Sequence, residues 1–193
     1  YSVIPIAGNE QARLGIVNGD YLGTTNSSNY FCVYNTVTGE KLSLSGMSYP
    51  CVYKDGWIGQ NPVNYNEIRI INGDGETFDI LNPYRDEFIP QAFVESDGGA
   101  LIFGKSVNYS SFDSRILYYK DGVFSERSSA ALFKSKDVSL AFRDSVDGSI
   151  WVNINGDWYQ TNDDGLTLSA ELISMGTGVR HVPTFSSKHI TVC

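Results

Sequence analysis

The stretch Cys51-Val-Tyr-Lys-Asp-Gly-Trp-Ile-Gly59 predicts a β-hairpin, and because the chain repeats this pattern, it indicates the architecture of the whole chain. Apolar residues flank an Asp-Gly pair, which favours tight hairpin turns because both residues tolerate a positive φ. The same pattern recurs in the stretches 14–23, 92–104 and 140–152. The turn glycines of the four hairpins are Gly19, Gly56, Gly98 and Gly148, with spacings of 37, 42 and 50 residues. We therefore expect these four glycines to occupy equivalent turns.

Each hairpin is followed by a polar loop, a third strand, another tight turn and a short fourth strand. The third strands are predicted at 30–34, 67–71, 115–119 and 157–160. The second turns contain Gly39, Gly75, Gly122 and Gly165, and the fourth strands follow at 41–44, 77–81, 123–127 and 168–173. Units of four antiparallel strands in about 40 residues are typical of β-propeller blades. The sequence thus predicts an all-β fold, a β-propeller.

The two ends of the chain carry further strand signals. The stretches 179–182 and 189–193 look like the first two strands of a fifth unit, and 1–6 is an extra strand before the first. A ring closes well when one blade combines strands from both termini, because closure removes exposed edges. We therefore expect a single domain, 1–193, with five blades and a closing blade shared by the termini. Four blades with terminal extensions, or a fragment of a larger ring, are the alternatives.

Two local motifs resemble known propeller repeats. Thr161-Asn-Asp-Asp-Gly-Leu-Thr167 resembles the Asp-box of sialidase-like propellers, with Leu168 in place of the family's Trp. This resemblance implies that Thr161, Asp163, Gly165 and Thr167 are structural turn residues. Asp144-Ser-Val-Asp-Gly-Ser-Ile-Trp-Val152 is similar to the repeats of two-component-regulator propellers. Both resemblances support the fold, and neither implies an activity, because propellers host many functions.

Composition narrows the classes of partner. The chain has 193 residues and a formal net charge of −8, and its Lys and Arg residues do not cluster. A nucleic-acid footprint is therefore absent, and no apolar run is long enough to insert in a membrane. The three cysteines, Cys32, Cys51 and Cys193, lack metal-ligand spacing, and we expect Cys32 and Cys51 to be buried thiols in strands. We expect no cofactor and no metal.

The sequence offers few candidates for catalytic residues. The chain has two histidines, His181 and His189, and no Gly-x-Ser-x-Gly nucleophile motif. Glycosidases need a pair of carboxylates about 5 to 10 Å apart, and Glu95 and Asp144 on first strands are the candidates for such axial acids. Each is next to a hairpin turn, where a solvated carboxylate is the simpler interpretation.

A repeated Asn-Tyr pair is the best candidate for a binding site. It precedes or opens the third strand as Asn29-Tyr30, Asn64-Tyr65 and Asn108-Tyr109. Loops between second and third strands emerge on one face of a propeller, so the three pairs would share a rim. Tyr offers a stacking face and a hydroxyl, and Asn offers a donor and an acceptor. The alternative is that Asn ends a loop and Tyr begins a strand for local conformational reasons alone.

These observations favour a non-catalytic binding module that recognises a glycan or a protein surface. Such a module would act as a receptor-binding or adhesion domain and be secreted, at the cell surface or part of a virion or phage particle. A structural subunit of a larger assembly is the second interpretation, and a glycosidase-type enzyme with axial carboxylates is the third.

Overall fold

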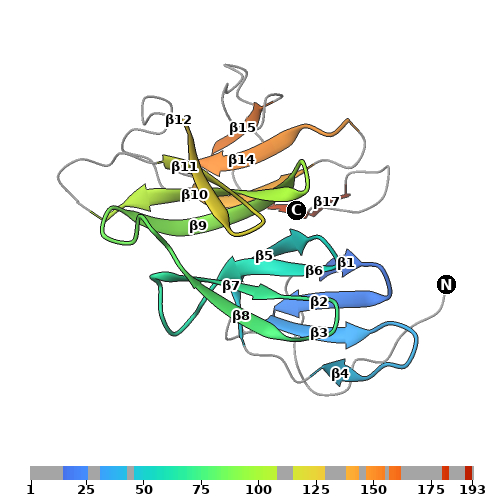
Figure 1. Cartoon of the computed structure of the whole chain (residues 1–193). Coiled ribbons are helices and arrows are strands. Elements are labelled where there is room, and N and C mark those ends of the chain that lie inside the picture. The colour runs from blue at the N-terminus through green and yellow to red at the C-terminus, as the bar shows by residue number, and fades with distance from the viewer. Residues whose placement is uncertain are drawn as a thin grey trace. The chain divides into compact units, whose positions relative to one another are not determined.

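The computed structural model describes residues 15–25, 31–42, 46–107, 115–128, 138–143, 147–154, 157–161, 180–182 and 190–192. The regular secondary structure in these ranges consists of β-strands alone, as the sequence predicts (Figure 1). The chain forms two compact units, unit 1 (Tyr1–Asn82) and unit 2 (Pro83–Cys193). Within the described residues, no helix has the length and apolar character needed to cross a membrane.

Unit 1 contains two four-stranded antiparallel sheets in which strands that follow each other in sequence also pair. The first has the order β1-β2-β3-β4, and the second has the order β5-β6-β7-β8. The bounds are β1 (Gly15–Asn18), β2 (Tyr21–Thr25), β3 (Phe31–Asn35), β4 (Lys41–Leu42), β5 (Ser48–Tyr53), β6 (Gly56–Gln60), β7 (Glu67–Ile71) and β8 (Thr77–Leu81). The predicted repeat of four strands is therefore confirmed, and β7 and β8 have the predicted bounds.

Unit 2 repeats this order in its first sheet, which runs β12-β11-β10-β9, and continues with β13-β14-β15 and the pair β16-β17. The bounds are β9 (Phe88–Ser96), β10 (Gly99–Ser106), β11 (Arg115–Lys120), β12 (Val123–Ser128), β13 (Val138–Arg143), β14 (Ile150–Ile154), β15 (Asp157–Thr161), β16 (Arg180–Val182) and β17 (Ile190–Val192). The predicted strands at 1–6 and 168–173 lie outside the described residues.

The core of unit 1 joins its two sheets around Trp57. This side chain is fully buried in β6, and the rings of Tyr21 from β2 and Phe31 from β3 meet it edge-on, with centroids 6.1 and 5.8 Å away. Val33, Met47 and Ile71 belong to the same cluster. Edge-to-face aromatic packing adds to the apolar burial, so the aromatic positions of the repeat hold adjacent sheets together.

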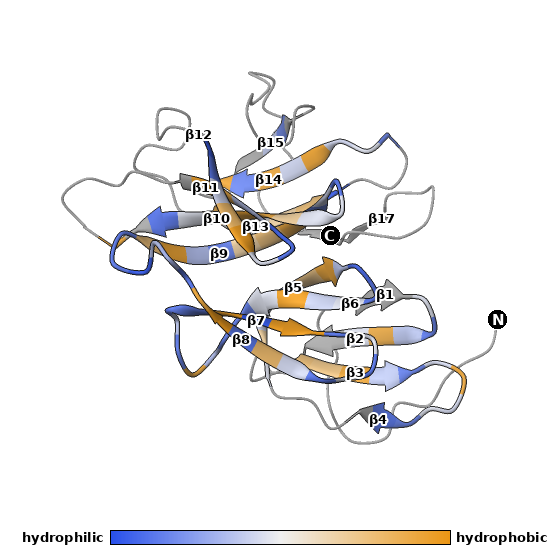
Figure 2. Ribbon diagram, in the orientation of Figure 1, coloured by the Kyte–Doolittle hydropathy of each residue, from blue (hydrophilic) through white to orange (hydrophobic). Residues whose placement is uncertain are grey.

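The core of unit 2 is built from alternate residues of its strands, because successive side chains of a strand point to opposite faces. In β14, Ile150, Val152 and Ile154 are buried, whereas Trp151 and Asn153 between them are half-buried. Figure 2 shows the corresponding change of hydropathy along the strand. Buried residues of β9, β10, β11 and β13 complete the cluster.

The turn glycines are not all equivalent, which corrects one sequence expectation. Gly19, Gly98 and Gly148 have positive φ values of 54°, 68° and 74°, as predicted. Gly56 does not lie in a turn: it is the first residue of β6, and Lys54, with a φ of 54°, takes the left-handed conformation instead. The reason for a glycine at 56 is space, because a Cβ there would lie 1.9 Å from the carbonyl oxygen of Ile71.

The remaining turn and cysteine predictions agree with the structure where it describes them. Gly39, Gly75 and Gly122 have φ values of 74°, 86° and 87°. Cys32 and Cys51 are buried as thiols in β3 and β5. Gly165 and Cys193 lie outside the described residues.

Candidate functional site

The loop between β6 and β7, residues 61–66, is organised by the buried side chain of Asn61. The Oδ1 atom of Asn61 accepts hydrogen bonds from the backbone N–H groups of Val63 (2.9 Å) and Asn64 (3.3 Å). This is the local turn that Asn side chains favour. The backbone N–H of Asn61 donates to the carbonyl of Glu67 at 3.0 Å, so the two ends of the loop are also joined.

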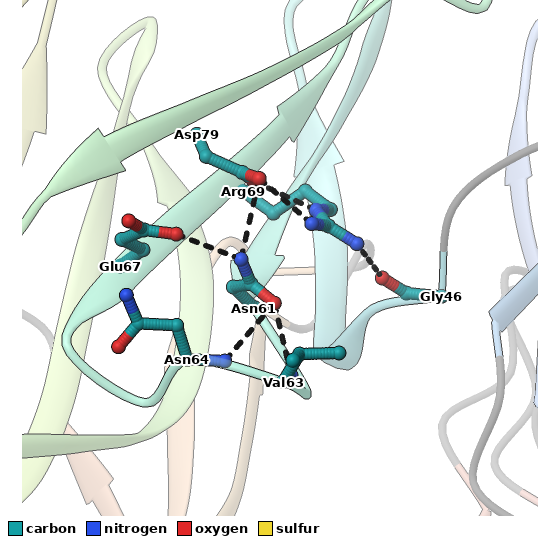
Figure 3. A network of polar contacts seen from close by, with 7 residues as sticks. All are labelled: Gly46, Asn61, Val63, Asn64, Glu67, Arg69 and Asp79. Carbon is teal, nitrogen blue, oxygen red and sulfur yellow. Dashed lines mark hydrogen bonds and ion pairs between the residues drawn. The ribbon is translucent and has the colours of Figure 1, made fainter.

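The same Asn61 side chain ties the loop to two carboxylates. Its Nδ2 donates to Glu67 Oε2 at 2.8 Å and to Asp79 Oδ2 at 3.2 Å (Figure 3). Because a carboxamide offers two donor hydrogens and one acceptor oxygen, Asn61 uses its full capacity. Only 4% of Asn61 is exposed, so these bonds replace the hydrogen bonds to water that the Asn61 carboxamide loses on burial.

Arg69 anchors the network beneath the loop. Its Nε and Nη2 atoms each donate to a different oxygen of Asp79 at 2.7 Å, and Nη1 donates to the carbonyl of Gly46 at 2.7 Å (Figure 3). Two parallel bonds between a guanidinium and a carboxylate are strong and directional. The hydrogen bond to Asp79 raises the pKa of Arg69, and the charges of Asp79 and Glu67 add to this, against a lowering by burial.

Replacing Asn61 with alanine is expected to loosen the loop. The change leaves the amides of Val63 and Asn64 without their acceptor and should destabilise the protein by about 1 to 2 kcal/mol. Urea denaturation measures the stability, and amide hydrogen exchange measures the protection of Val63 and Asn64. Asn66→Ala is the matched control, because the side chain of Asn66 is exposed and no hydrogen bond of the network uses it. Equal protection in both variants would contradict the assignment.

The loop presents apolar and aromatic side chains to solvent. Val63 is 85% exposed and Tyr65 is 64% exposed. Asn64 is half-buried, and its Oδ1 accepts a hydrogen bond from the backbone N–H of Asn66 at 3.2 Å. Tyr65 is therefore the solvent-exposed residue of the predicted Asn-Tyr pair, and Asn64 helps to shape the turn that presents it.

Most other predicted site residues cannot be compared with the structure. Asn29, Tyr30, Asn108 and Tyr109 lie outside the described residues, as do Asp163, Gly165 and Thr167 of the Asp-box-like stretch and the candidate acid Asp144. Thr161 is the last residue of β15, and His181 lies in β16. Glu95 is exposed in β9, so its carboxylate is solvated near the hairpin turn. Among the described residues, no group of three or more His, Cys, Asp or Glu is placed to hold a metal ion.

The sequence analysis missed Asn61, Glu67, Arg69 and Asp79 as parts of this site. The sequence does contain a hint of the pairing of Arg69 with Asp79, because both residues are equally far in sequence from Asp74 in the turn between β7 and β8. They are indeed cross-strand partners in the register of these strands. An arginine between two isoleucines in a short strand therefore indicates a partner at the mirrored position.

Comparison with known proteins identifies the fold. No family model and no curated protein matches the sequence. Among solved structures, a catalytically inactive virginiamycin B lyase from Staphylococcus aureus with quinupristin is similar at 16% identity and a TM-score of 0.59. The match covers 86% of this chain and 57% of the lyase. YCF48 from Cyanidioschyzon merolae is similar at 10% identity and a TM-score of 0.57, over 93% of this chain and 65% of YCF48.

BamB from Moraxella catarrhalis is also similar, at 12% identity and a TM-score of 0.52, over 72% of this chain and 39% of BamB. These neighbours are β-propeller proteins. The chain thus shares their all-β fold of four-stranded antiparallel sheets, and it spans between 39% and 65% of their lengths. At identities this low, the similarity concerns the fold alone.

Proposed function

We propose that the chain is a non-catalytic binding module that recognises a glycan or a protein surface through the loop 61–66. The observation that carries the proposal is the partly buried network of Asn61, Arg69 and Asp79, which supports a loop with Val63 and Tyr65 in solvent. A loop that is ordered before binding loses less conformational entropy when it meets its partner. An exposed tyrosine adds a flat apolar face and a hydroxyl, which suits sugar rings and protein surfaces alike.

The proposal extends to the whole ring. In it, five blades of four strands surround an axis, the two chain ends share the closing blade, and Asn29-Tyr30 and Asn108-Tyr109 join Tyr65 on one rim. The pairing of β16 with β17 after the fourth unit supports a fifth unit. The module would act outside the cell, at the cell surface or on a virion or phage particle, where it meets such glycans and proteins.

Replacing Tyr65 with alanine is expected to weaken binding without loss of stability. Removing an aromatic contact residue should lower affinity by about tenfold to a hundredfold, whereas an exposed side chain contributes little to folding. The measurement is a glycan-array screen followed by calorimetric titration of the best glycan. Val37→Ala is the control, because Val37 is 75% exposed but belongs to the turn after β3 and not to the loop 61–66.

Two results would contradict this proposal. One is an array without any bound glycan combined with no binding to immobilised protein fractions. The other is binding that stays intact when Asn64 and Tyr65 are both replaced with alanine.

A further inference from the structure

The strand β8 is an edge strand with exposed apolar side chains. It is the last strand of its sheet, and no described residue pairs with its outer side. Phe78 is 49% exposed and Leu81 is 53% exposed, and Ile80 between them is half-buried. These residues follow the polar turn before β8 (Figure 2). An edge of this kind offers unpaired backbone N–H and C=O groups to another strand.

The one charge on β8 does not protect this edge. Natural edge strands avoid unwanted pairing by carrying charged side chains, above all lysine. In β8 the only charged residue is Asp79, and both of its carboxylate oxygens accept hydrogen bonds from Arg69 at 2.7 Å. The carboxylate is therefore held by the neighbouring strand β7 and balanced by its guanidinium.

The edge strand β12 of unit 2 differs from β8 in its charged residues. It carries Ser125 and Glu126 as exposed residues, and the guanidinium of Arg127 lies 4.0 Å from the ring centroid of Tyr118. Val123, 66% exposed, stands at the start of this strand. β12 thus carries two charged residues, Glu126 and Arg127, whereas the single charge of β8, Asp79, is paired with Arg69.

Charge around β8 selects the kind of strand that can pair with it. The hairpin 67–81 contains four carboxylates, Glu67, Asp74, Glu76 and Asp79, against one guanidinium, Arg69. Asp74 and Glu76 are exposed at the turn that leads into β8. A second copy of this chain would bring a second set of carboxylates to the same edge, which is unfavourable because like charges repel. A basic segment would instead find complementary charge.

We propose that β8 binds an extended, basic segment of a partner protein by strand addition. Backbone hydrogen bonds to the outer side of β8 supply affinity, as in other cases of β-augmentation. Phe78 and Leu81 point to opposite faces of the sheet, so apolar residues on both faces of the segment make the side-chain contacts. Lysine or arginine residues that flank the segment face Asp74 and Glu76. The Leu81 end of β8 lies next to the loop 61–66, since Leu81 pairs with Glu67 and the Asn82 N–H donates to the Asn66 carbonyl, whereas Phe78 pairs with Ile70 nearer the other end. The two proposals can still fail independently, because one is measured by glycan binding and Tyr65→Ala and the other by peptide binding and Phe78→Lys.

The test uses a synthetic peptide of about ten residues, with alternating valine and threonine between lysine pairs. Fluorescence polarisation should detect binding to the full chain. A peptide with glutamates in place of the lysines, and one with a central proline, should each bind at least about tenfold more weakly. Amide hydrogen exchange should show new protection in β8 when the lysine peptide is present.

Variants locate the binding. Phe78→Lys places a charged residue on the edge and should weaken peptide binding by about tenfold, whereas Val123→Lys on β12 should leave it unchanged. Leu81→Lys repeats the test if Phe78→Lys unfolds the protein. Equal binding of the lysine and proline peptides, or equal effects of Phe78→Lys and Val123→Lys, would overturn the proposal. So would self-association that depends on Phe78 without peptide binding, because a second copy would then be the occupant.

Discussion

Replacing Gly56 with alanine should destabilise the protein by about 3 kcal/mol, close to the upper range for single substitutions that overfill a packed site. A Cβ at this position would lie 1.9 Å from the carbonyl oxygen of Ile71 and 2.8 Å from the Cα of Asn72. Both contacts are with backbone, which cannot rotate away as a side chain can. Ile71 is also fully buried and is the cross-strand partner of Trp57 and Thr77, so relief of the clash would disturb two strand pairs.

Gly19→Ala is the matched control for this prediction. Gly19 has a φ of 54°, but a Cβ there would meet nothing within 4 Å. The cost is then the left-handed conformation alone, about 1 kcal/mol. Urea denaturation of both variants compares the two free energies of unfolding. If the two losses were equal, the close approach of Gly56 to β7 would not be the reason for its presence.

Replacing Arg69 with alanine is the second large effect that we expect, a loss of about 3 kcal/mol. The change removes both bonds to Asp79 and the bond to the Gly46 carbonyl, and it leaves a partly buried carboxylate without its counter-charge. Arg69→Lys retains a charge but not the planar fork, so it should lose part of this stability. The free energy of unfolding from urea titration measures both losses.

A double-mutant cycle measures the coupling energy between Arg69 and Asp79. Each single substitution leaves the other partner without its ionic contact, which costs stability. The double variant Arg69→Ala/Asp79→Ala avoids this cost, so its loss of unfolding free energy should be smaller than the sum of the two single losses. Strict additivity of the two losses would contradict a direct coupling. The double variant should also reduce the hydrogen-exchange protection of the amides in the loop 61–66, since Asp79 accepts a hydrogen bond from Asn61.

The pH dependence of this effect follows from the pKa of Arg69. The bond to Asp79 raises that pKa above its usual value. A group whose pKa rises on folding contributes its full stabilisation below the unfolded pKa, and loses it as the pH rises through the folded one. For a guanidinium both values lie far above neutrality, so titration of Arg69 gives the loss in Arg69→Ala no pH dependence between about pH 6 and about pH 8.

The strands and their order could be predicted from the sequence because their causes are local. Alternating apolar residues and turns that need a positive φ define β7 and β8 to the residue, and hairpin connections make sequence neighbours pair. Gly19 and Gly98 behave as expected for the same reason. The prediction for Gly56 was wrong because an Asp-Gly pair has two possible explanations, a turn that needs the conformation or a strand that needs the space.

The site could be predicted only in part. The repeated Asn-Tyr motif led to the loop 61–66, in which Tyr65 is exposed, and the role of this loop in binding stays a prediction. Asn61 carried no such signal, since its role depends on Glu67 and on Asp79, which is 18 residues away in the sequence. Which loop residue is exposed and which is structural depends on these contacts, and the repeat does not contain that information.

The class of fold and the repeating four-stranded sheet follow from the order of residues alone, because period, turn chemistry and apolar alternation act over a few residues. Three features became visible once the sheets were seen packed. Gly56 is a packing residue, Arg69 and Asp79 form a partly buried ion pair next to the loop, and β8 is an edge strand with exposed apolar side chains. These features depend on distances between strands that are set when the sheets pack, and pairs far apart in the chain acquire their roles only at that point.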